Sequence, residues 1–181
     1  VDKFYSVGLL ITEPNSLTSA FNITNIVIMN FHGGLYLINS NNANIANNVF
    51  SFVSFSNIFY IGSGSTITNN ILKFTGNLIL GDGIDVLNSS NLVLLKNIIS
   101  SGASYGITIA GSNNITLDNN RITDNLSYGV YISSSSAVEI SKDKILSKLT
   151  ANYKLKPLSN LNIHLLHNYF EQNRYGLTAK Y

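Results

Sequence analysis

The sequence lacks cysteine and tryptophan, and it has only one methionine and two prolines. Without cysteine there is no disulfide framework and no thiolate chemistry. Charged residues make up only 11% of the 181 residues and the net charge is +2, whereas binding to nucleic acid requires a concentrated basic surface. No apolar run reaches the ~18 residues of a transmembrane helix. These shortages argue against nucleic acid as the main partner and against membrane insertion.

What the sequence does have is 45% hydrophobic residues, together with many Asn, Ser and Thr. Regularly spaced apolar residues in this proportion indicate a folded chain rather than a disordered one. A length of 181 residues is enough for one domain with a continuous core, so we treat residues 1–181 as a single domain. The first residue is Val1, and no signal peptide precedes it. We therefore expect a mature or trimmed piece of a longer product.

Two short phrases recur along the chain. In the first, Gly precedes alternating apolar residues, as in Gly83-Ile84-Asp85-Val86. In the second, Asn or Ser precedes two apolar residues that flank a polar one, as in Asn114-Ile115-Thr116-Leu117. Both phrases advance by the same interval, in the series Ile84, Ile107, Val130 and in the series Leu92, Ile115, Val138, Leu161. Internal periodicity at a fixed interval of this length indicates a repeat architecture.

Each repeat alternates apolar and polar residues with a period of two, which is typical of β-strands. The strands are separated by short runs of Asn, Gly and Ser, which leave no room for helices between them. Parallel strands normally need a long crossover, and in a solenoid the rest of the coil provides it. The sequence therefore predicts an all-β fold, a right-handed parallel β-helix (solenoid) of about eight coils with about 23 residues in each repeat.

A column of Asn residues supports the same register. Asn97, Asn120 and Asp143 recur at the interval of the repeat, and the pairs Asn47/Asn48 and Asn69/Asn70 occupy the equivalent place in earlier repeats. Side-chain amides stacked at the spacing of β-strands can hydrogen-bond along the stack, as they do in cross-β structures. We interpret these Asn residues as structural.

The repeats resemble the large superfamily of parallel β-helix proteins with carbohydrate-linked roles. That superfamily includes polygalacturonases, pectate lyases, polysaccharide epimerases and many non-catalytic surface proteins. The resemblance covers nearly the whole chain but rests on a degenerate repeat, so it implies the fold more strongly than the function. It leads us to expect a protein that is extracellular or on a cell or virus surface.

The segment Gly81-Asp82-Gly83-Ile84-Asp85-Val86 is similar to the Asn-Thr-Asp-Gly-Ile-Asp segment of polygalacturonases. In that family the first Asp works with two more carboxylates on the following coil, and a Gly-His-Gly and an Arg-Ile-Lys come later. Several carboxyl groups are needed because one protonates the leaving oxygen while another serves the water. Here the acidic pair falls on Ser104 and Tyr105, the His position falls on Tyr128, and no Arg-Ile-Lys follows. The match with the catalytic family therefore stops at one segment.

We therefore expect a non-catalytic structural or adhesive module. The alternative is a polysaccharide hydrolase, lyase or epimerase that uses Asp82 and Asp85, with a missing partner supplied by another chain or domain. Two carboxylates alone are too few for a Ca²⁺ site, and His164 and His167 lack a third ligand for zinc. We expect no metal site and no cofactor. The repeat also resembles periplasmic accessory proteins of metalloenzyme maturation, but the lack of Cys disfavours that option.

In this superfamily, ligands commonly lie along the outer face of the strand that follows the Gly. The period of two assigns to that face Leu10, Tyr36, Phe59 or Tyr60, Asp85, Thr108, Tyr131, Lys154 and Thr178, and Tyr105, Tyr128 and Tyr175 come just before the Gly. Tyrosine rings suit sugar faces because they combine an apolar body with a hydrogen-bonding tip. The predicted ligand-binding residues are Tyr36, Asp85, Tyr105, Tyr128, Tyr131 and Lys154, with a polysaccharide or surface glycan as partner. The simpler alternative is that the stacked rings only stabilise neighbouring coils.

The ends of the predicted rod suggest a further property. Solenoids need caps, and neither residues 1–6 nor residues 176–181 contain an amphipathic capping helix. An uncapped parallel edge accepts another strand. We therefore expect the rod to continue into further sequence or to associate end to end with other copies.

Overall fold

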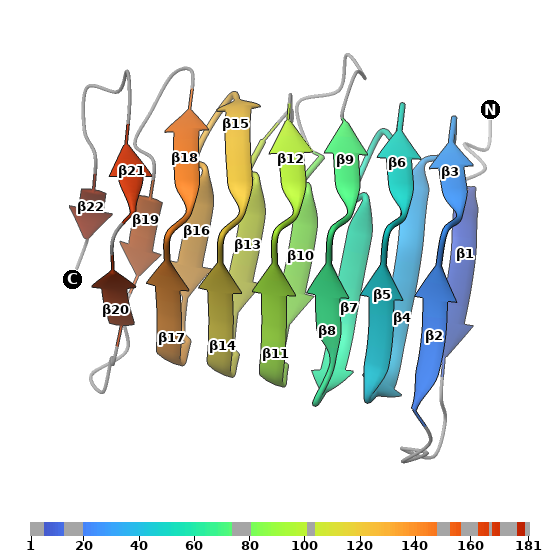
Figure 1. Cartoon of the computed structure of the whole chain (residues 1–181), viewed down its shortest axis with the longest axis horizontal. Coiled ribbons are helices and arrows are strands. Elements are labelled where there is room, and N and C mark those ends of the chain that lie inside the picture. The colour runs from blue at the N-terminus through green and yellow to red at the C-terminus, as the bar shows by residue number, and fades with distance from the viewer. Residues whose placement is uncertain are drawn as a thin grey trace, which may run out of the picture.

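The computed structural model describes residues 6–12, 20–73, 81–100, 104–147, 153–156, 163–166, 168–170 and 177–179, and after Ile145 it describes only the side chains of His164 and Asn168. Every regular element in these ranges is a β-strand. The same ranges contain no helix long and apolar enough to cross a membrane. The strands stack into a rod along which the chain advances coil by coil (Figure 1). The predicted all-β solenoid is confirmed.

The described strands form three columns, and neighbours within each column pair in parallel. The first column consists of β1 (Val7–Thr12), β4 (Gly33–Asn41), β7 (Ile58–Ser63), β10 (Ile84–Leu87), β13 (Ile107–Ala110), β16 (Val130–Ser133), β19 (Tyr153–Lys156) and β22 (Leu177–Ala179). The second consists of β2 (Phe21–Thr24), β5 (Ala43–Ala46), β8 (Thr66–Thr68), β11 (Ser90–Leu95), β14 (Asn113–Asp118), β17 (Ser136–Ser141) and β20 (Ile163–Leu166). The third consists of β3 (Val27–Met29), β6 (Val49–Ser51), β9 (Ile71–Lys73), β12 (Ile98–Ser100), β15 (Arg121–Asn125), β18 (Lys144–Ser147) and β21 (Tyr169–Phe170). Together these strands make a series of coils with three strands each, followed by the first strand of one more coil. The number of complete coils is slightly lower than the sequence predicted.

The predicted register holds through the middle of the rod. In the first column, Ile84 pairs with Ile107, Ile107 with Val130, and Val130 with Tyr153, at equal steps. The early coils vary around this length, because the step from Val7 to Gly33 and the step from Ile58 to Ile84 are each three positions longer. The variation is absorbed mostly between strands, with a register shift inside the β4–β7 pair between Ile38 and Ser40, and the columns stay parallel.

One predicted register position is wrong. Val138 pairs with Ile163 and not with Leu161. The first column keeps its regular step at β19, so the extra residues of this coil lie in the sequence between β19 and β20. Ile163 and Leu165 alternate as well as Leu161 and Ile163 do, which is why the pattern alone did not distinguish the two registers.

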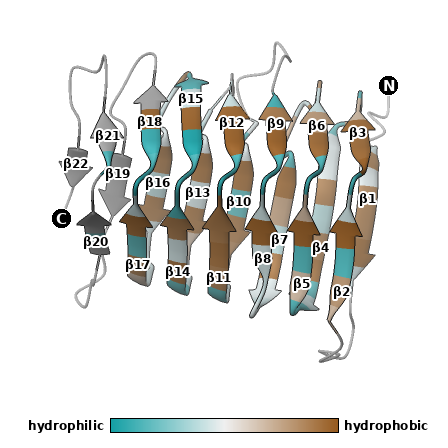
Figure 2. Cartoon of the chain, in the orientation of Figure 1, coloured by the Kyte–Doolittle hydropathy of each residue, from teal (hydrophilic) through white to brown (hydrophobic). Residues whose placement is uncertain are grey.

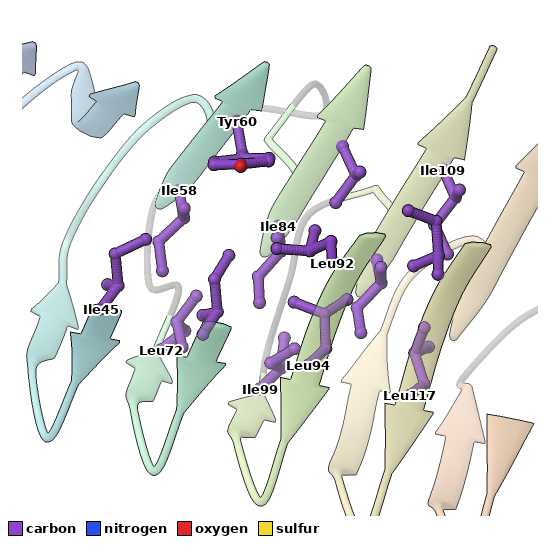
Figure 3. Packing of buried hydrophobic residues seen from close by; sticks show 14 of the residues in the cluster. Ile45, Ile58, Tyr60, Leu72, Ile84, Leu92, Leu94, Ile99, Ile109 and Leu117 are labelled. Carbon is purple, nitrogen blue, oxygen red and sulfur yellow. The ribbon is translucent and has the colours of Figure 1, made fainter. Parts of the chain in front are cut away.

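Side chains that point inward fill the rod with apolar layers. In β11, Leu92 and Leu94 are fully buried, while Val93 between them is half-buried on the outer side. Brown, hydrophobic positions recur in the coloured strands and alternate with white or teal polar ones (Figure 2). Buried side chains from successive coils lie next to one another inside the rod (Figure 3). Complete burial of a Leu or Ile side chain contributes about 1.5–3 kcal/mol, so each coil adds its own stabilising layer.

The recurring Gly marks a place where neighbouring coils approach too closely for a side chain. A Cβ on Gly83 would overlap both the carbonyl oxygen of Gly106 and the Cγ2 atom of Ile99. In the coil of β7 the Gly is absent and Asn57 takes its place, since Leu35 N donates to the Asn57 carbonyl. The Asn57 Oδ1 atom is buried without a hydrogen-bond partner, so this coil keeps the register at the expense of an unsatisfied polar atom.

The Asn column forms a continuous hydrogen-bonded stack, here called the amide ladder. The Oδ1 of each member accepts a hydrogen bond from the backbone N–H of the member one coil earlier, as between Asn97 N and Asn120 Oδ1 at 2.9 Å. The Nδ2 of each Asn donates to a carbonyl oxygen of the second column, as from Asn120 to Leu94 at 2.9 Å. The ladder consists of Asn48, Asn70, Asn97, Asn120, Asp143 and Asn168. The structural interpretation of these residues agrees with this geometry.

Candidate functional site

The outward residues of the first column lie in a single line along the rod. Backbone pairing connects Leu10 with Tyr36, Tyr36 with Phe59, Phe59 with Asp85, Asp85 with Thr108, Thr108 with Tyr131, Tyr131 with Lys154, and Lys154 with Thr178. The open choice in β7 falls on Phe59, because Tyr60 is fully buried and its hydroxyl donates to the Ser40 carbonyl at 3.0 Å. The sequence pattern therefore located this line of residues correctly, while their role in binding stays a prediction.

A second line of residues runs beside the first, at the turn that leads into each strand. Asn57 N donates to the Asp82 carbonyl, Gly83 N to the Tyr105 carbonyl, and Gly106 N to the Tyr128 carbonyl. These bonds stack Asp82, Tyr105 and Tyr128 in successive coils. Predicted ligand residues from two different sequence positions of the repeat are thereby brought onto one surface.

Asp82 and Asp85 form a carboxyl pair at the centre of this surface. Their side chains are in hydrogen-bonding contact. The Ser56 hydroxyl donates to Asp85 Oδ2. Asp82 accepts from the Tyr105 backbone N–H at 3.0 Å and from the Thr108 hydroxyl at 2.7 Å. Neighbouring coils on both sides thus hold the two carboxyl groups in place.

The environment of the pair keeps a proton on Asp85 at neutral pH. Burial, followed by the charge of Asp82 and the hydrogen bond with Asp82, raises the pKa of Asp85 from 3.8 to about 8, while the Ser56 hydroxyl opposes the shift. Two carboxyl groups in contact cannot both be ionised cheaply, which is why the neighbouring carboxyl group adds to the rise in the pKa of Asp85. The pair therefore offers both an acidic O–H and acceptor oxygens to a ligand.

Aromatic rings lie on both sides of the carboxyl pair along the rod. Toward the N-terminal coils, the Tyr36 and Phe59 ring centroids are 5.2 Å apart. Toward the C-terminal coils, the Tyr105 ring stacks on Tyr128 at 5.7 Å and on Tyr131 at 5.2 Å. All five rings are half-buried, so each keeps an accessible part. Burial and then the charge of Asp85 raise the pKa of Tyr36, which keeps its hydroxyl protonated as a donor.

We call this surface the aromatic face. It consists of Tyr36, Ser56, Phe59, Asp82, Asp85, Tyr105, Thr108, Tyr128 and Tyr131. Of the predicted ligand residues, the structure brings together all except Lys154, which follows Tyr131 in the backbone register of β19 and whose side chain lies outside the described residues. The sequence pattern did not identify Ser56, because the longer step to the next coil hides its equivalence to Asp82.

The geometry limits the chemistry that the carboxyl pair can perform. Glycosidases that use two carboxyl groups separate them by about 5–5.5 Å in retaining enzymes and about 6.5–9.5 Å in inverting ones, so that the sugar or a water fits between them. Asp82 and Asp85 are in direct contact, which leaves no such space. The pair is suited to binding hydroxyl groups or to moving one proton, and it does not match either hydrolytic arrangement.

Among the described residues, no group of three or more His, Asp or Glu side chains could hold a metal ion. His164 is exposed beside Glu139 in the register of the second column, where a recess of about 160 Å³ also touches Thr116. The His167 of the predicted His pair lies outside the described residues. The recess is on a different column from the aromatic face, and a single His with one carboxylate is too few ligands for a zinc site.

Several solved structures have the same fold. A double mutant of the periplasmic alginate epimerase AlgG matches with a TM-score of 0.68 and 17% identity, over 96% of this chain and 46% of that one. The enzymatically active domain of tailspike protein 2 of bacteriophage CBA120 matches with a TM-score of 0.60 and 14% identity, over 87% and 24%. PfbA, a surface adhesin of Streptococcus pneumoniae, matches with a TM-score of 0.54 and 14% identity, over 90% and 62%. The chain thus spans less than two thirds of each of these proteins.

Identities this low show a shared fold and no more. No curated protein sequence matches the chain. The family model described as the right-handed β-helix region matches residues 8–148. This range contains the aromatic face, the amide ladder as far as Asp143 and most of the described core. The chain belongs to the right-handed β-helix family.

Proposed function

We propose that this chain is a non-catalytic glycan-binding module of a secreted or surface protein, and that it holds a polysaccharide on the aromatic face. The observation that carries the proposal is the order of groups along the rod. The Tyr36 and Phe59 rings, the Asp82–Asp85 pair and the Tyr105 ring cluster follow one another on one sheet face. Rings pack on the apolar faces of sugars, and the carboxyl oxygens between them accept hydrogen bonds from sugar hydroxyls.

The fold gives this proposal further support. Proteins with the same architecture include an alginate epimerase, a phage tailspike domain and a surface adhesin. These neighbours are periplasmic, viral or on a cell surface, which favours a location outside the cytoplasm for this chain as well. End-to-end association or continuation of the rod stays a prediction.

The experiment that tests binding compares retention on immobilised polysaccharides. We expect Tyr105→Ala to weaken retention at least about tenfold, which corresponds to about 1.4 kcal/mol, because the ring stacks on both Tyr128 and Tyr131 and its loss opens the whole cluster. Val27→Ala is the control, since Val27 is 59% exposed in the third column, away from the aromatic face. Equal retention of the two variants, with both folded by circular dichroism, would contradict the proposal.

A second candidate is a polysaccharide-active lyase or epimerase that uses Asp82 and Asp85, or a hydrolase that combines one of them with a carboxyl group from another chain or domain. The observation in its favour is the raised pKa of Asp85 beside Asp82, because acid–base catalysis needs a carboxyl group that holds its proton near neutral pH. The same retention assay distinguishes the candidates if the soluble fraction is also analysed. Release of sugar products or unsaturated ends, abolished by Asp82→Ala, would establish the enzyme and overturn the non-catalytic module.

A further inference from the structure

The distribution of charge around the aromatic face restricts the polysaccharides that it can hold. From β4 to β16 the first column contains no Lys or Arg, and Asp85 is its one acidic residue. In the sequence between the described strands, residues 74–80 and 101–103 contain no charged residue. The Lys and Arg side chains that the structure describes belong to the other columns and their turns, namely Lys73, Lys96, Arg121, Lys142 and Lys144.

An acidic polysaccharide would therefore meet only negative charge on this surface. A polyuronate presents one carboxylate on each sugar, and those nearest to Asp82 and Asp85 would find like charge and no cation within the described part of the face. Like charges across an interface disfavour a partner and give specificity against it. The nearest Lys in the same line is Lys154, one coil beyond Tyr131.

We propose, on the basis of the glycan-binding function above, that the ligand is an uncharged polysaccharide whose chain runs parallel to the rod, with the hydroxyl groups of one sugar on Asp82 and Asp85. Neighbouring sugars pack on the Tyr36–Phe59 rings on one side and on the Tyr105 cluster on the other. Two adjacent hydroxyl groups fit the pair because one carboxyl accepts while the protonated carboxyl both donates and accepts.

The spacing of the coils sets the length of ligand that fills the face. Neighbouring strands are about 4.8 Å apart, so the four coil steps from Tyr36 to Tyr131 span about 19 Å. An extended pyranose polymer advances by about one strand spacing per sugar. An oligosaccharide that covers the face from Tyr36 to Tyr131 therefore needs about five sugars, whereas about three sugars span the two steps from Phe59 to Thr108 and contact both ring clusters.

The test uses polymers that differ only in charge. A polyuronate and the same polymer after chemical reduction of its carboxyl groups to hydroxymethyl groups have identical linkages, and several such pairs are compared by affinity electrophoresis with the wild-type chain. We expect at least tenfold stronger retention by the neutral member of one pair, with little dependence on salt, and affinity that rises with chain length up to about five sugars. In the Asp82→Asn/Asp85→Asn double variant, which keeps the shape of the pair, we expect the preference for the neutral member to fall at least tenfold.

Three other results would overturn the neutral ligand, its orientation or the proposed function. Stronger, salt-sensitive retention by the acidic member, lost on Lys154→Ala, would overturn the neutral ligand and leave the glycan-binding function standing. Retention that does not change with chain length would overturn the orientation along the rod. If no member of any pair is retained while the chain is folded, the proposed function itself is overturned. The comparison within each pair needs only the wild-type chain, so it stands even if the double variant does not fold.

Discussion

Replacing Asp143 by Asn should stabilise the rod, and by an amount that depends on pH. Asp143 is the one carboxyl group in the amide ladder, and it is only 1% exposed. Its Oδ1 accepts from Asn120 N, while its Oδ2 is buried without a hydrogen-bond partner. The neighbouring members of the ladder, Asn120 and Asn168, donate from Nδ2 to the carbonyl oxygens of Leu94 and Ile140. Strand pairing places Leu117 between these two carbonyls, so Leu117 O is the acceptor that Asp143 can reach only when protonated.

The size of the stabilisation expected for Asp143→Asn follows from the ionisation of the Asp143 carboxyl group. Burial raises the pKa of Asp143 from 3.8 to about 7, opposed by the hydrogen bonds from Asn120 and assisted by the charge of Asp118. The folded state therefore holds a proton that the unfolded state releases, and the free energy of unfolding falls as pH rises from about 4 to about 7. Each unit of pKa shift is worth about 1.4 kcal/mol, so ionised Asp143 costs the folded state about 4 kcal/mol above pH 7.

The assay is thermal unfolding followed by circular dichroism between pH 4 and pH 9. At pH 4 we expect Asp143→Asn to match the wild type within about 1 kcal/mol, because the protonated carboxyl can donate as the amide does. At pH 8 we expect the variant to melt about 10 °C higher, since about 1 kcal/mol moves the midpoint by about 2–4 °C in a chain of this size. Asp124→Asn removes an exposed carboxylate and serves as the control. A difference that is the same at pH 4 and pH 8 would refute the reasoning.

Three more changes test the packing and the carboxyl pair. Leu94→Ala should cost about 2–5 kcal/mol in urea unfolding because Leu94 is fully buried, whereas exposed Val27→Ala should stay within about 0.5 kcal/mol; equal effects would contradict the described core. Gly62→Ala should destabilise the fold by more than about 1 kcal/mol, because its Cβ would overlap the Ser40 carbonyl oxygen, and an unchanged melting temperature would show that the coils can separate. Asp85→Asn should flatten the fall of stability between about pH 4 and pH 8 that the raised pKa of Asp85 causes, and a slope equal to that of the wild type would contradict the raised pKa.

The sequence was sufficient to predict the fold and the line of outward residues, because both depend on periodicity. Once Ile84, Ile107 and Val130 are in register, alternation decides which of their neighbours face outward. The predicted register was wrong at Leu161 and Ile163, where the coil length changes, because apolar residues two positions apart satisfy the same alternation.

The periodicity of the sequence did not predict the side-chain contacts within the aromatic face. Periodicity placed Asp82 and Asp85 near each other but could not show that they touch, nor that Ser56 and Thr108 bind them from other coils. Hydrogen bonds of this kind depend on side-chain rotamers and on the exact offset between coils of unequal length. The same limit applies to Asp143, whose place in the ladder was predicted but whose unpaired oxygen was not.

The constant step between β10 and β19 has a consequence for how such a protein can change over time. Because Ile84, Ile107, Val130 and Tyr153 succeed one another at equal intervals, a duplication or loss of one whole repeat in this region would bring equivalent residues back into contact. The buried apolar layers and the hydrogen bonds of the amide ladder would form again between equivalent residues. The outer surface would become longer or shorter by one strand spacing of about 4.8 Å. The length of the aromatic face can therefore change in steps of one whole coil, while the interior keeps the same contacts.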